Sequence, residues 1–262
     1  MKNFASAFAV ELLKLRRSNV ALFTALGFSI PALIGGLFMI ILKDPVKAQS
    51  MGLISAKAQL TAGTAEWSTL FNLLAQAVAV GGGIIFAIFT AWIFGREFSD
   101  HTAKELLALP TPREAIVGAK LALTALWTFV LTLECYVLGL IIGKLVDIPG
   151  WSMDLFRSAT VDILGTGILV IILLPFVAFF ASAGKGYLPS FGWLVASTVT
   201  AQVAAITGWG DWFPWSVPAL FSGAVGPRSE FLGMHSYVLI VLTSIIGIAA
   251  TFYWWRTADQ TR

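Results

Sequence analysis

The stretch Val161-Asp-Ile-Leu-Gly-Thr-Gly-Ile-Leu-Val-Ile-Ile-Leu-Leu-Pro-Phe-Val-Ala-Phe-Phe-Ala-Ser-Ala183 decides the fold class of this chain. It carries one charged side chain, Asp162, near its first residue. About 20 apolar residues in a helix cross the ~30 Å hydrocarbon core of a bilayer. A helix also satisfies its own backbone hydrogen bonds where water is missing. The stretch therefore predicts a transmembrane helix.

Five further segments have the same character, and the alternating pattern of membrane β-strands is absent. We therefore predict an all-α polytopic membrane protein in which residues 1–262 form a single transmembrane domain. The six predicted spans are Val20–Leu42, Leu70–Phe94, Ile116–Ile142, Val161–Ala183, Leu188–Ile206 and Tyr237–Trp255.

The composition of the whole chain agrees with this class. Apolar residues make up 58% and charged residues 12% of the 262 residues, whereas soluble domains carry about 25% charged residues. So few charges exclude an ordinary soluble enzyme and a disordered protein. The chain has one cysteine, Cys135, so a disulfide framework or a cysteine-based zinc site within the chain is excluded as well.

The positions of Lys and Arg predict the orientation. With the N-terminus inside, eleven of the 17 basic residues lie on the cytoplasmic side and six on the opposite side. This bias places both termini in the cytoplasm, which agrees with an even number of spans. Most of the ten tryptophans fall near predicted span ends, as expected for rings at the headgroup level.

Residues 1–17 precede the first span and have a pattern of their own. Phe4, Phe8, Leu12 and Leu15 recur at helical spacing, with Arg16 and other basic residues at the end. The pattern predicts a helix lying in the inner membrane interface. The alternative is a basic flank that only sets the topology.

Residues 95–114 hold the only dense charge cluster of the sequence. Seven of the 31 charged residues lie between Arg96 and Glu114. The patterns Thr102-x-x-Glu105 and Thr111-Pro-Arg-Glu114 read as two capping boxes, the second with proline at the first helical position. They predict a short, rigid cytoplasmic helix between spans two and three, suited to docking a soluble partner. The alternative is a well-capped hairpin without a partner.

Residues 207–235 form the least ordinary loop. Its first part is dense in aromatic residues and helix breakers, and it continues as an apolar piece too short to span. We predict an external re-entrant segment with the character of a gate. The alternative is an ordinary loop anchored by tryptophans. The candidate gate residues are Trp209, Trp212, Phe213 and Trp215.

Glu134 is the clearest acidic group at membrane depth, in the middle of the third predicted span. An ionisable side chain there is costly and usually faces a bundle interior or a cavity. Glu134 could line a substrate path, or it could accept hydrogen bonds from a neighbouring helix and only pack the bundle. The sequence contains no P-loop motif for ATP and no paired-histidine metal motif, so we predict no cofactor and no metal in this chain.

The run Glu97-Phe98-x-x-x-Thr102-x-Lys104-x-Leu106-Leu107-x-x-Pro110-x-x-Arg113-x-x-x-x-x-x-Lys120 resembles the segment between spans two and three of ABC-2 type ABC transporter permeases. The likeness is greatest to the small permeases of bacitracin- and lantibiotic-resistance exporters. Glu11-x-x-Lys14-x-x-Arg17 and Phe213-Pro-Trp-Ser-Val-Pro218 are similar to features of the same group. His101 stands where many relatives have glycine, which should affect only the local turn.

The resemblance implies a permease without its own ATPase activity, working as a dimer in the bacterial plasma membrane. Two cytoplasmic P-loop ATPase subunits would bind ATP and Mg²⁺, membrane lipids would surround the dimer, and nucleic acid would have no part. Glu97 would be the central coupling residue, and residues 209–226 would form the external gate. The residues implied in ATPase coupling are Glu97, Arg96, Thr102, Lys104, Glu105, Arg113, Glu11 and Lys14.

The same resemblance leaves the transported substrate open. The overwhelmingly apolar spans favour an amphiphilic peptide, antibiotic or lipid-like molecule moved out of the cytoplasm or inner leaflet. The alternatives are ion efflux or export for cofactor assembly by a related permease. A non-transport membrane enzyme or scaffold would need paired polar groups at membrane depth. Glu134 is the only such group that the sequence clearly predicts there.

Overall fold

The computed structural model describes residues 2–44, 52, 64–102, 105, 111–225 and 232–257. All regular structure in these ranges is helical, and they contain no strand. The leucines, isoleucines, valines and phenylalanines that face outward along the long helices are the side chains that lipid solvates. The predicted all-α class is therefore confirmed for the described part of the chain.

Five helical stretches are long and apolar enough to cross a membrane. At 1.5 Å per residue, the longest of them exceed the ~30 Å hydrocarbon core, so their ends reach into the interfaces. They match five of the six predicted spans. The stretches are α2 (Val20–Lys43), the continuous Trp67–Ser99, α8 (Arg113–Leu145), α9 (Met153–Ala183) and α12 (Met234–Thr257).

The sixth predicted span is a helix with the predicted bounds, α10 (Leu188–Ile206). It is not among the five helices with enough apolar character, because hydroxyl and amide side chains such as Ser190, Ser197 and Gln202 interrupt it. The helix is thus confirmed, and its crossing of the membrane stays a prediction.

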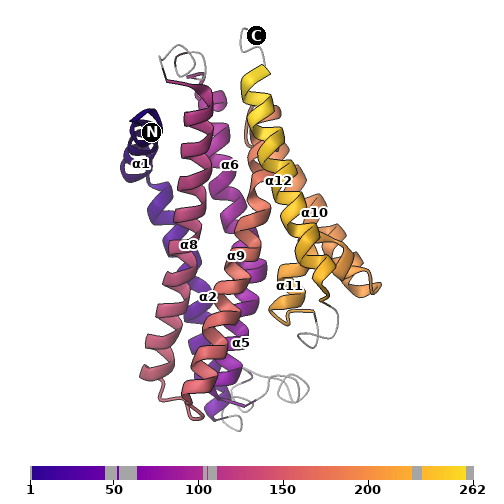
Figure 1. Ribbon diagram of the computed structural model, residues 1–262. Helices are drawn as coiled ribbons and strands as arrows, with labels where there is room; N and C mark the ends of the chain where they lie inside the picture. Colours follow the sequence, from indigo (N-terminus) through magenta and orange to yellow (C-terminus); the bar gives the residue numbers. More distant parts are fainter. Residues whose placement is uncertain are drawn as a thin grey trace.

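The helices form an elongated bundle in which α9 packs against α6, α8, α10 and α12 (Figure 1). Helix α1 (Lys2–Arg17) and the last turn of α12 lie at the same end of this bundle, the top of Figure 1. An ion pair between Arg256 of α12 and Glu114 at the start of α8, 2.8 Å long, joins the elements at that end. We call it the α1 end.

Two glycines of α8 let α5 (Trp67–Ala77) approach closely. A Cβ atom on Gly139 would lie 2.2 Å from Leu74, and one on Gly143 would lie 2.4 Å from Trp67. Real Cβ atoms do not tolerate such distances, so only glycine fits at these two positions. The small-residue spacing of the third span therefore serves helix packing.

The second span changes its hydrogen-bond pattern in the middle. Helix α5 passes into a π-helical turn, η1 (Val78–Gly82), and then into α6 (Gly83–Ser99). The run Gly81-Gly82-Gly83 lies at this change. Single π turns inside α-helices are frequent at functional sites, and this one faces the cavity described below.

The described part of residues 207–235 folds into three short turns. They are η2 (Gly210–Trp212), η3 (Pro214–Ser216) and α11 (Val217–Phe221). Val217 is fully buried in a cluster with Leu169 of α9 and Ile240 of α12. In Figure 1, α11 lies beside the bundle short of the end opposite to α1. The segment is thus packed against the helices, whereas its re-entry into a membrane stays a prediction.

Candidate functional site

Four charged side chains from three helices meet at the α1 end of the bundle. Glu11 and Lys14 come from α1, Glu97 from the last turns of α6, and Lys120 from the second turn of α8. Helical spacing alone accounts for the pair Glu11–Lys14, 2.7 Å apart at positions i and i+3. The other contacts need the three helices to pack together. We call these four residues the charge cluster.

Lys120 is the centre of the charge cluster and is fully buried. Its Nζ lies 2.8 Å from Glu97 Oε1 and 3.2 Å from Glu11 Oε2, and it donates to the backbone oxygen of Ile93 at 2.8 Å. An ammonium group has three donors, so each of them has an acceptor here. Full pairing explains how a charge can stay in this buried position.

Two further basic groups face Glu97: Lys14 of the charge cluster, and Arg96, which lies beside the cluster. Lys14 Nζ lies 3.1 Å from Glu97 Oε1, so this oxygen accepts from two ammonium groups. Arg96 Nε is 3.6 Å from the same atom, and its guanidinium lies over the Trp92 ring, 4.8 Å from the ring centre. A cation over an aromatic face is held in place. Two carboxylates thus face three basic groups.

The second carboxylate oxygen of Glu97, Oε2, is buried and accepts no hydrogen bond from the described residues. A buried acceptor without a donor is costly. Glu97 itself is only 2% exposed, so it acts from within the bundle and presents no carboxylate to a soluble protein. Its contacts with Lys14 and Lys120 link α6 to α1 and α8 at the α1 end.

The other predicted coupling residues lie elsewhere at the α1 end. Arg113 donates from its guanidinium to the backbone oxygen of Trp255 at 3.2 Å, the usual use of a cation at a helix C-terminus. Thr102 and Glu105 are exposed. Lys104 lies outside the described residues, as do residues 106–110, so the predicted short helix between spans two and three is not described.

The start of α8 corrects one expectation. The second capping box, with Pro112 at the first helical position, was predicted to open this helix. In the structure α8 begins at Arg113, Pro112 is the N-cap, and no side chain caps the helix. Proline has no N–H to donate, and the N–H groups of Ala115 and Ile116 bind the Pro112 oxygen instead. The turn is therefore closed by backbone alone.

His101 lies two residues after the end of α6 and has a left-handed backbone conformation, with φ 57°. Thr102 N donates to Glu97 O at 2.9 Å and His101 N to Phe98 O at 3.3 Å, which is the Schellman pattern of helix ends. That position favours glycine because it has no Cβ. The expectation that histidine in place of glycine concerns only the local turn agrees with this geometry.

The predicted gate residues form an aromatic surface beside α10 and α12. Trp209 and Trp212 are exposed, and Trp212 stacks on His235 with ring centres 4.4 Å apart. His235 Nε2 is also 3.0 Å from Asp211 Oδ2. Trp215 packs edge-on against Trp193 of α10, and Phe213 packs on Trp215 at 5.4 Å. The ring contacts of this segment thus join Trp212 to His235 of α12, and Phe213 and Trp215 to Trp193 of α10.

Glu134 is engaged by a neighbouring helix. Ser29 of α2 donates to its Oε1 at 2.8 Å. The Ser29 hydroxyl is also within hydrogen-bond distance of the Ala25 oxygen of its own helix, so its one proton is shared between the two acceptors. Of the two interpretations left open for Glu134, this contact favours the packing of α2 on α8, and the residue lines neither of the two cavities found in the described part of the bundle.

With this geometry in place, the chain can be compared with known proteins. The family model described as ABC-2 family transporter protein matches residues 7–201, more than half of the chain. The chain belongs to the ABC-2 transporter family. It is therefore a membrane permease subunit and not itself an enzyme, and the family implies an ATPase subunit as partner.

One curated relative of this permease carries a functional name. The chain is 27% identical to the bacitracin transport permease protein BCRB of Bacillus licheniformis over 176 residues, which cover 67% of the permease and 84% of that protein. No solved structure matches. The resemblance to ABC-2 permease proteins predicted from residues 97–120 is thus confirmed.

Reasoning from sequence named Glu97, Glu11, Lys14 and Arg96 as coupling residues, and the structure brings all four together. The sequence analysis gave Lys120 as the last residue of the run that carries the family resemblance but did not name it as a coupling residue, although the four assemble around it. A signal was available, because Lys120 is the only basic residue within the predicted span Ile116–Ile142. A cation at that depth needs acidic partners, and Glu11 and Glu97 are acids of the neighbouring helices.

Proposed function

We propose that this permease is the membrane-spanning subunit of an ATP-driven exporter and moves an amphiphilic peptide, antibiotic or lipid-like molecule outward across a bacterial plasma membrane. The observation that carries the proposal is the charge cluster. It ties the first helix of the chain to the two spans that flank residues 95–114. A motor protein bound at this end would move three helices through one rigid junction.

Six spans, with both termini on the cytoplasmic side, belong to this proposal. Both ends of the described chain lie at the α1 end, so the number of crossings is even (Figure 1). Five helices have the apolar character of spans, and α10 supplies the sixth crossing. Its first residues follow a turn that packs against α6, since a Cβ on Gly95 would lie 3.0 Å from Gly186.

The ATPase subunits, with bound ATP and Mg²⁺, would bind the α1 end. The exposed residues Thr102 and Glu105 lie in the segment available to such a partner, whereas Glu97 and Lys120 lie beneath it. A force on residues 95–114 would reach α1 and α8 through these buried ion pairs. Differential affinity of the ATPase for two arrangements of the helices would then drive the change of state.

A second permease copy and the surrounding lipids complete the proposed assembly. Helix α2 exposes a continuous apolar face that includes Phe23, Ile30 and Leu37. Lipid chains or the second copy would cover such a face in a membrane. We propose a homodimer, with one ATPase on each permease copy.

The proposed substrate class rests on the named relative and on the apolar interior. The relative is named for bacitracin transport, and bacitracin is therefore the first compound to test. Ion efflux is disfavoured, because the carboxylate of Glu134 is engaged by Ser29. No other acidic residue of the described part lies near the middle of a span.

The test is bacitracin susceptibility in bacteria that lack a transporter of this kind. Cells would express the permease alone, the permease with its P-loop ATPase partner, or the permease with that ATPase carrying a replaced P-loop lysine. Only the second strain should show raised resistance, and the ATPase should co-purify with the permease in the second and third. Full resistance from the permease alone would contradict an ATP-driven exporter.

A further inference from the structure

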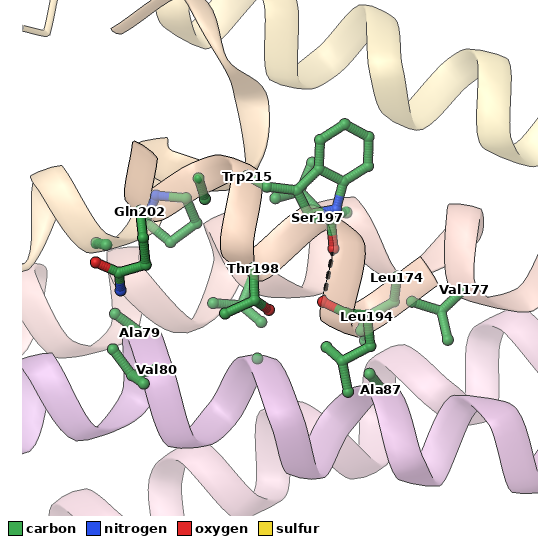
Figure 2. Close-up of a pocket in the computed structure, with 16 residues that line it drawn as sticks. Ala79, Val80, Ala87, Leu174, Val177, Leu194, Ser197, Thr198, Gln202 and Trp215 are labelled. Atoms are coloured by element: carbon green, nitrogen blue, oxygen red, sulfur yellow. Dashed lines mark hydrogen bonds between the residues drawn. The ribbon is translucent and has the colours of Figure 1, made fainter. Parts of the chain in front are cut away.

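A cavity lies between four elements of the bundle, away from the charge cluster. Figure 2 shows it bounded by the second span, α9, α10 and the turn that carries Trp215. Its volume is about 90 Å³. The residues that define its walls are Val80, Gly83, Leu174, Val177, Leu194 and Trp215.

The position of these residues along their helices places the cavity at membrane depth. Gly83 is the middle residue of the stretch Trp67–Ser99, and Leu194 to Gln202 lie in the middle of Leu188–Ile206. A helix rises 1.5 Å per residue, so these positions are far from either end of the span. In a membrane, the cavity faces hydrocarbon and not a headgroup layer.

The wall of the cavity is mostly apolar, and the hydroxyl group at its back is already hydrogen-bonded within its own helix. The one hydroxyl at its back, on Ser197, donates to the Leu194 oxygen of its own helix at 3.1 Å, as drawn in Figure 2. An apolar cavity offers water too few partners to hold it, and such cavities bind apolar molecules instead. The occupant that this wall fits is a hydrocarbon chain.

The mouth of the cavity opens sideways, between the second span and α10. Val80 is 45% exposed on one side, and Thr198 and Gln202 are exposed on the other. The Gln202 side chain has no hydrogen-bond partner among the described residues, so its amide is available to a polar group at the mouth. The apolar slot fits one hydrocarbon chain of an amphiphile. The amide at its rim can then hydrogen-bond to the polar part of the molecule where that part begins.

We propose that this cavity binds one alkyl chain of an amphiphile that enters from the surrounding bilayer. The proposal rests on the proposed function only in taking the helices as spans. It is independent of the ATPase partner and of transport. The chain can come from a bilayer phospholipid or from a single-chain amphiphile, and the two share the same contacts in the slot.

Two neighbouring glycines allow a matched test. Gly83 lines the cavity and Gly81 does not, although both belong to the same glycine run. A Cβ on either residue would meet nothing within 4 Å, so both positions accept a side chain. Gly83→Leu fills the slot, whereas Gly81→Leu adds the same side chain outside it.

The experiment is photo-crosslinking of the full chain in phosphatidylglycerol vesicles, without ATP. One sample carries phosphatidylglycerol with a diazirine in one acyl chain, and another carries lysophosphatidylglycerol with the same group. Mass spectrometry maps the labelled peptides. We expect labels on 79–87 and 194–202 in the unmodified chain. Gly83→Leu should lower them about tenfold, because its side chain replaces methylene groups of the bound chain, and Gly81→Leu should leave them unchanged.

The two probes separate the two sources of the chain. Labelling by the phospholipid probe identifies a resident bilayer lipid, and labelling by the lysolipid probe alone identifies a single-chain ligand. Either result supports the proposal. Labels spread evenly over the outer faces of α2 and α12, with none in the cavity peptides, would overturn it. That map comes from the unmodified chain, so it is decisive whether or not either variant folds.

Discussion

At the residue scale, the protein depends on one buried ammonium group. Lys120 is fully buried and has three acceptors from two other helices, one in α1 and two in α6. Removing one partner of a buried, hydrogen-bonded charge group costs far more than the net contribution of the pair, since the remaining charges are left uncompensated. The charge cluster therefore behaves as a unit, in which Lys14 and Lys120 each pair with both Glu11 and Glu97.

We predict that Lys120→Met lowers the free energy of unfolding by about 3 kcal/mol, because Glu11 and Glu97 would lose the fully buried one of the two cations that they share. The measurement is thermal unfolding of the purified permease in detergent. Lys144→Met is the matched control, since Lys144 is an exposed lysine of the same helix. Equal stability of the two variants would contradict a central role for Lys120.

His101 leads to a second prediction at this scale. Its left-handed backbone costs a non-glycine residue about 1 kcal/mol. His101→Gly should therefore raise the stability of the permease by up to about that amount, as a higher midpoint of thermal unfolding. Thr102→Gly, one residue further on, should lower the midpoint slightly. A loss of stability in both variants would show that the histidine side chain contributes more than its backbone costs.

At the scale of elements, close packing of small residues decides how the spans meet. Helix α5 rests on α8 where Gly139 and Gly143 leave no room for a side chain. Helix α12 approaches α9 in the same way, since a Cβ on Gly247 would lie 3.0 Å from the backbone nitrogen of Phe176. Packing of this kind replaces the hydrophobic effect, which cannot drive helices together in lipid.

Gly143→Ala should destabilise the permease by about 1–3 kcal/mol, because the new methyl group would overlap the Trp67 ring. Gly118→Ala in the same helix is the control, since its Cβ would meet Phe4 at an ordinary 3.5 Å. That control should be neutral or stabilising, because alanine favours a helix over glycine. Thermal unfolding in detergent compares them. A neutral Gly143→Ala would mean that α5 can shift away from α8 freely.

The elements were predictable from the sequence to different degrees. Apolar length located α2, α8, α9 and α12, because a span must satisfy its own backbone. It could not decide whether α10 crosses, since serines, threonines and Gln202 weaken its apolar signal. It also gave no sign of the π turn at Val78–Gly82, although the glycine run indicated a bend or a close approach.

The candidate site was predictable in part. The family resemblance implied Glu97 and Arg96, and helical spacing paired Glu11 with Lys14, but Lys120 is 109 residues from Glu11 along the chain. Which helices pack together is a property of the tertiary structure, and neither periodicity nor charge pattern contains it. The cavity beside Gly83 was invisible for the same reason, because its walls come from four separate elements.

At the scale of the whole molecule, the permease has two ends with different chemistry. The charge cluster and both described ends of the chain lie at the α1 end, and the aromatic segment 209–221 lies toward the other (Figure 1). Helix α9 packs against α6 and α8 and also against α11. Under the proposed function, motion that begins at residues 95–114 would pass through α6 and α8, which the charge cluster joins, to α9 and from there to the aromatic segment.

The most direct test of this central claim follows one reporter cysteine in the permease reconstituted with its ATPase. Ala219→Cys places a half-buried thiol on α11, while the native Cys135 stays buried. The measurement is the rate at which a membrane-impermeant maleimide labels this thiol, with and without ATP and Mg²⁺. Glu97→Gln tests the cluster in that background, and Asp154→Asn, in an exposed ion pair outside it, is the control.

We predict that ATP and Mg²⁺ change the labelling rate by about tenfold with the native cluster and with Asp154→Asn, a free-energy difference of about 1.4 kcal/mol between states. With Glu97→Gln the ATPase should still co-purify, and the change should fall below about twofold. The same response to ATP in Glu97→Gln as in the native cluster would contradict the claim that these buried ion pairs transmit the motion.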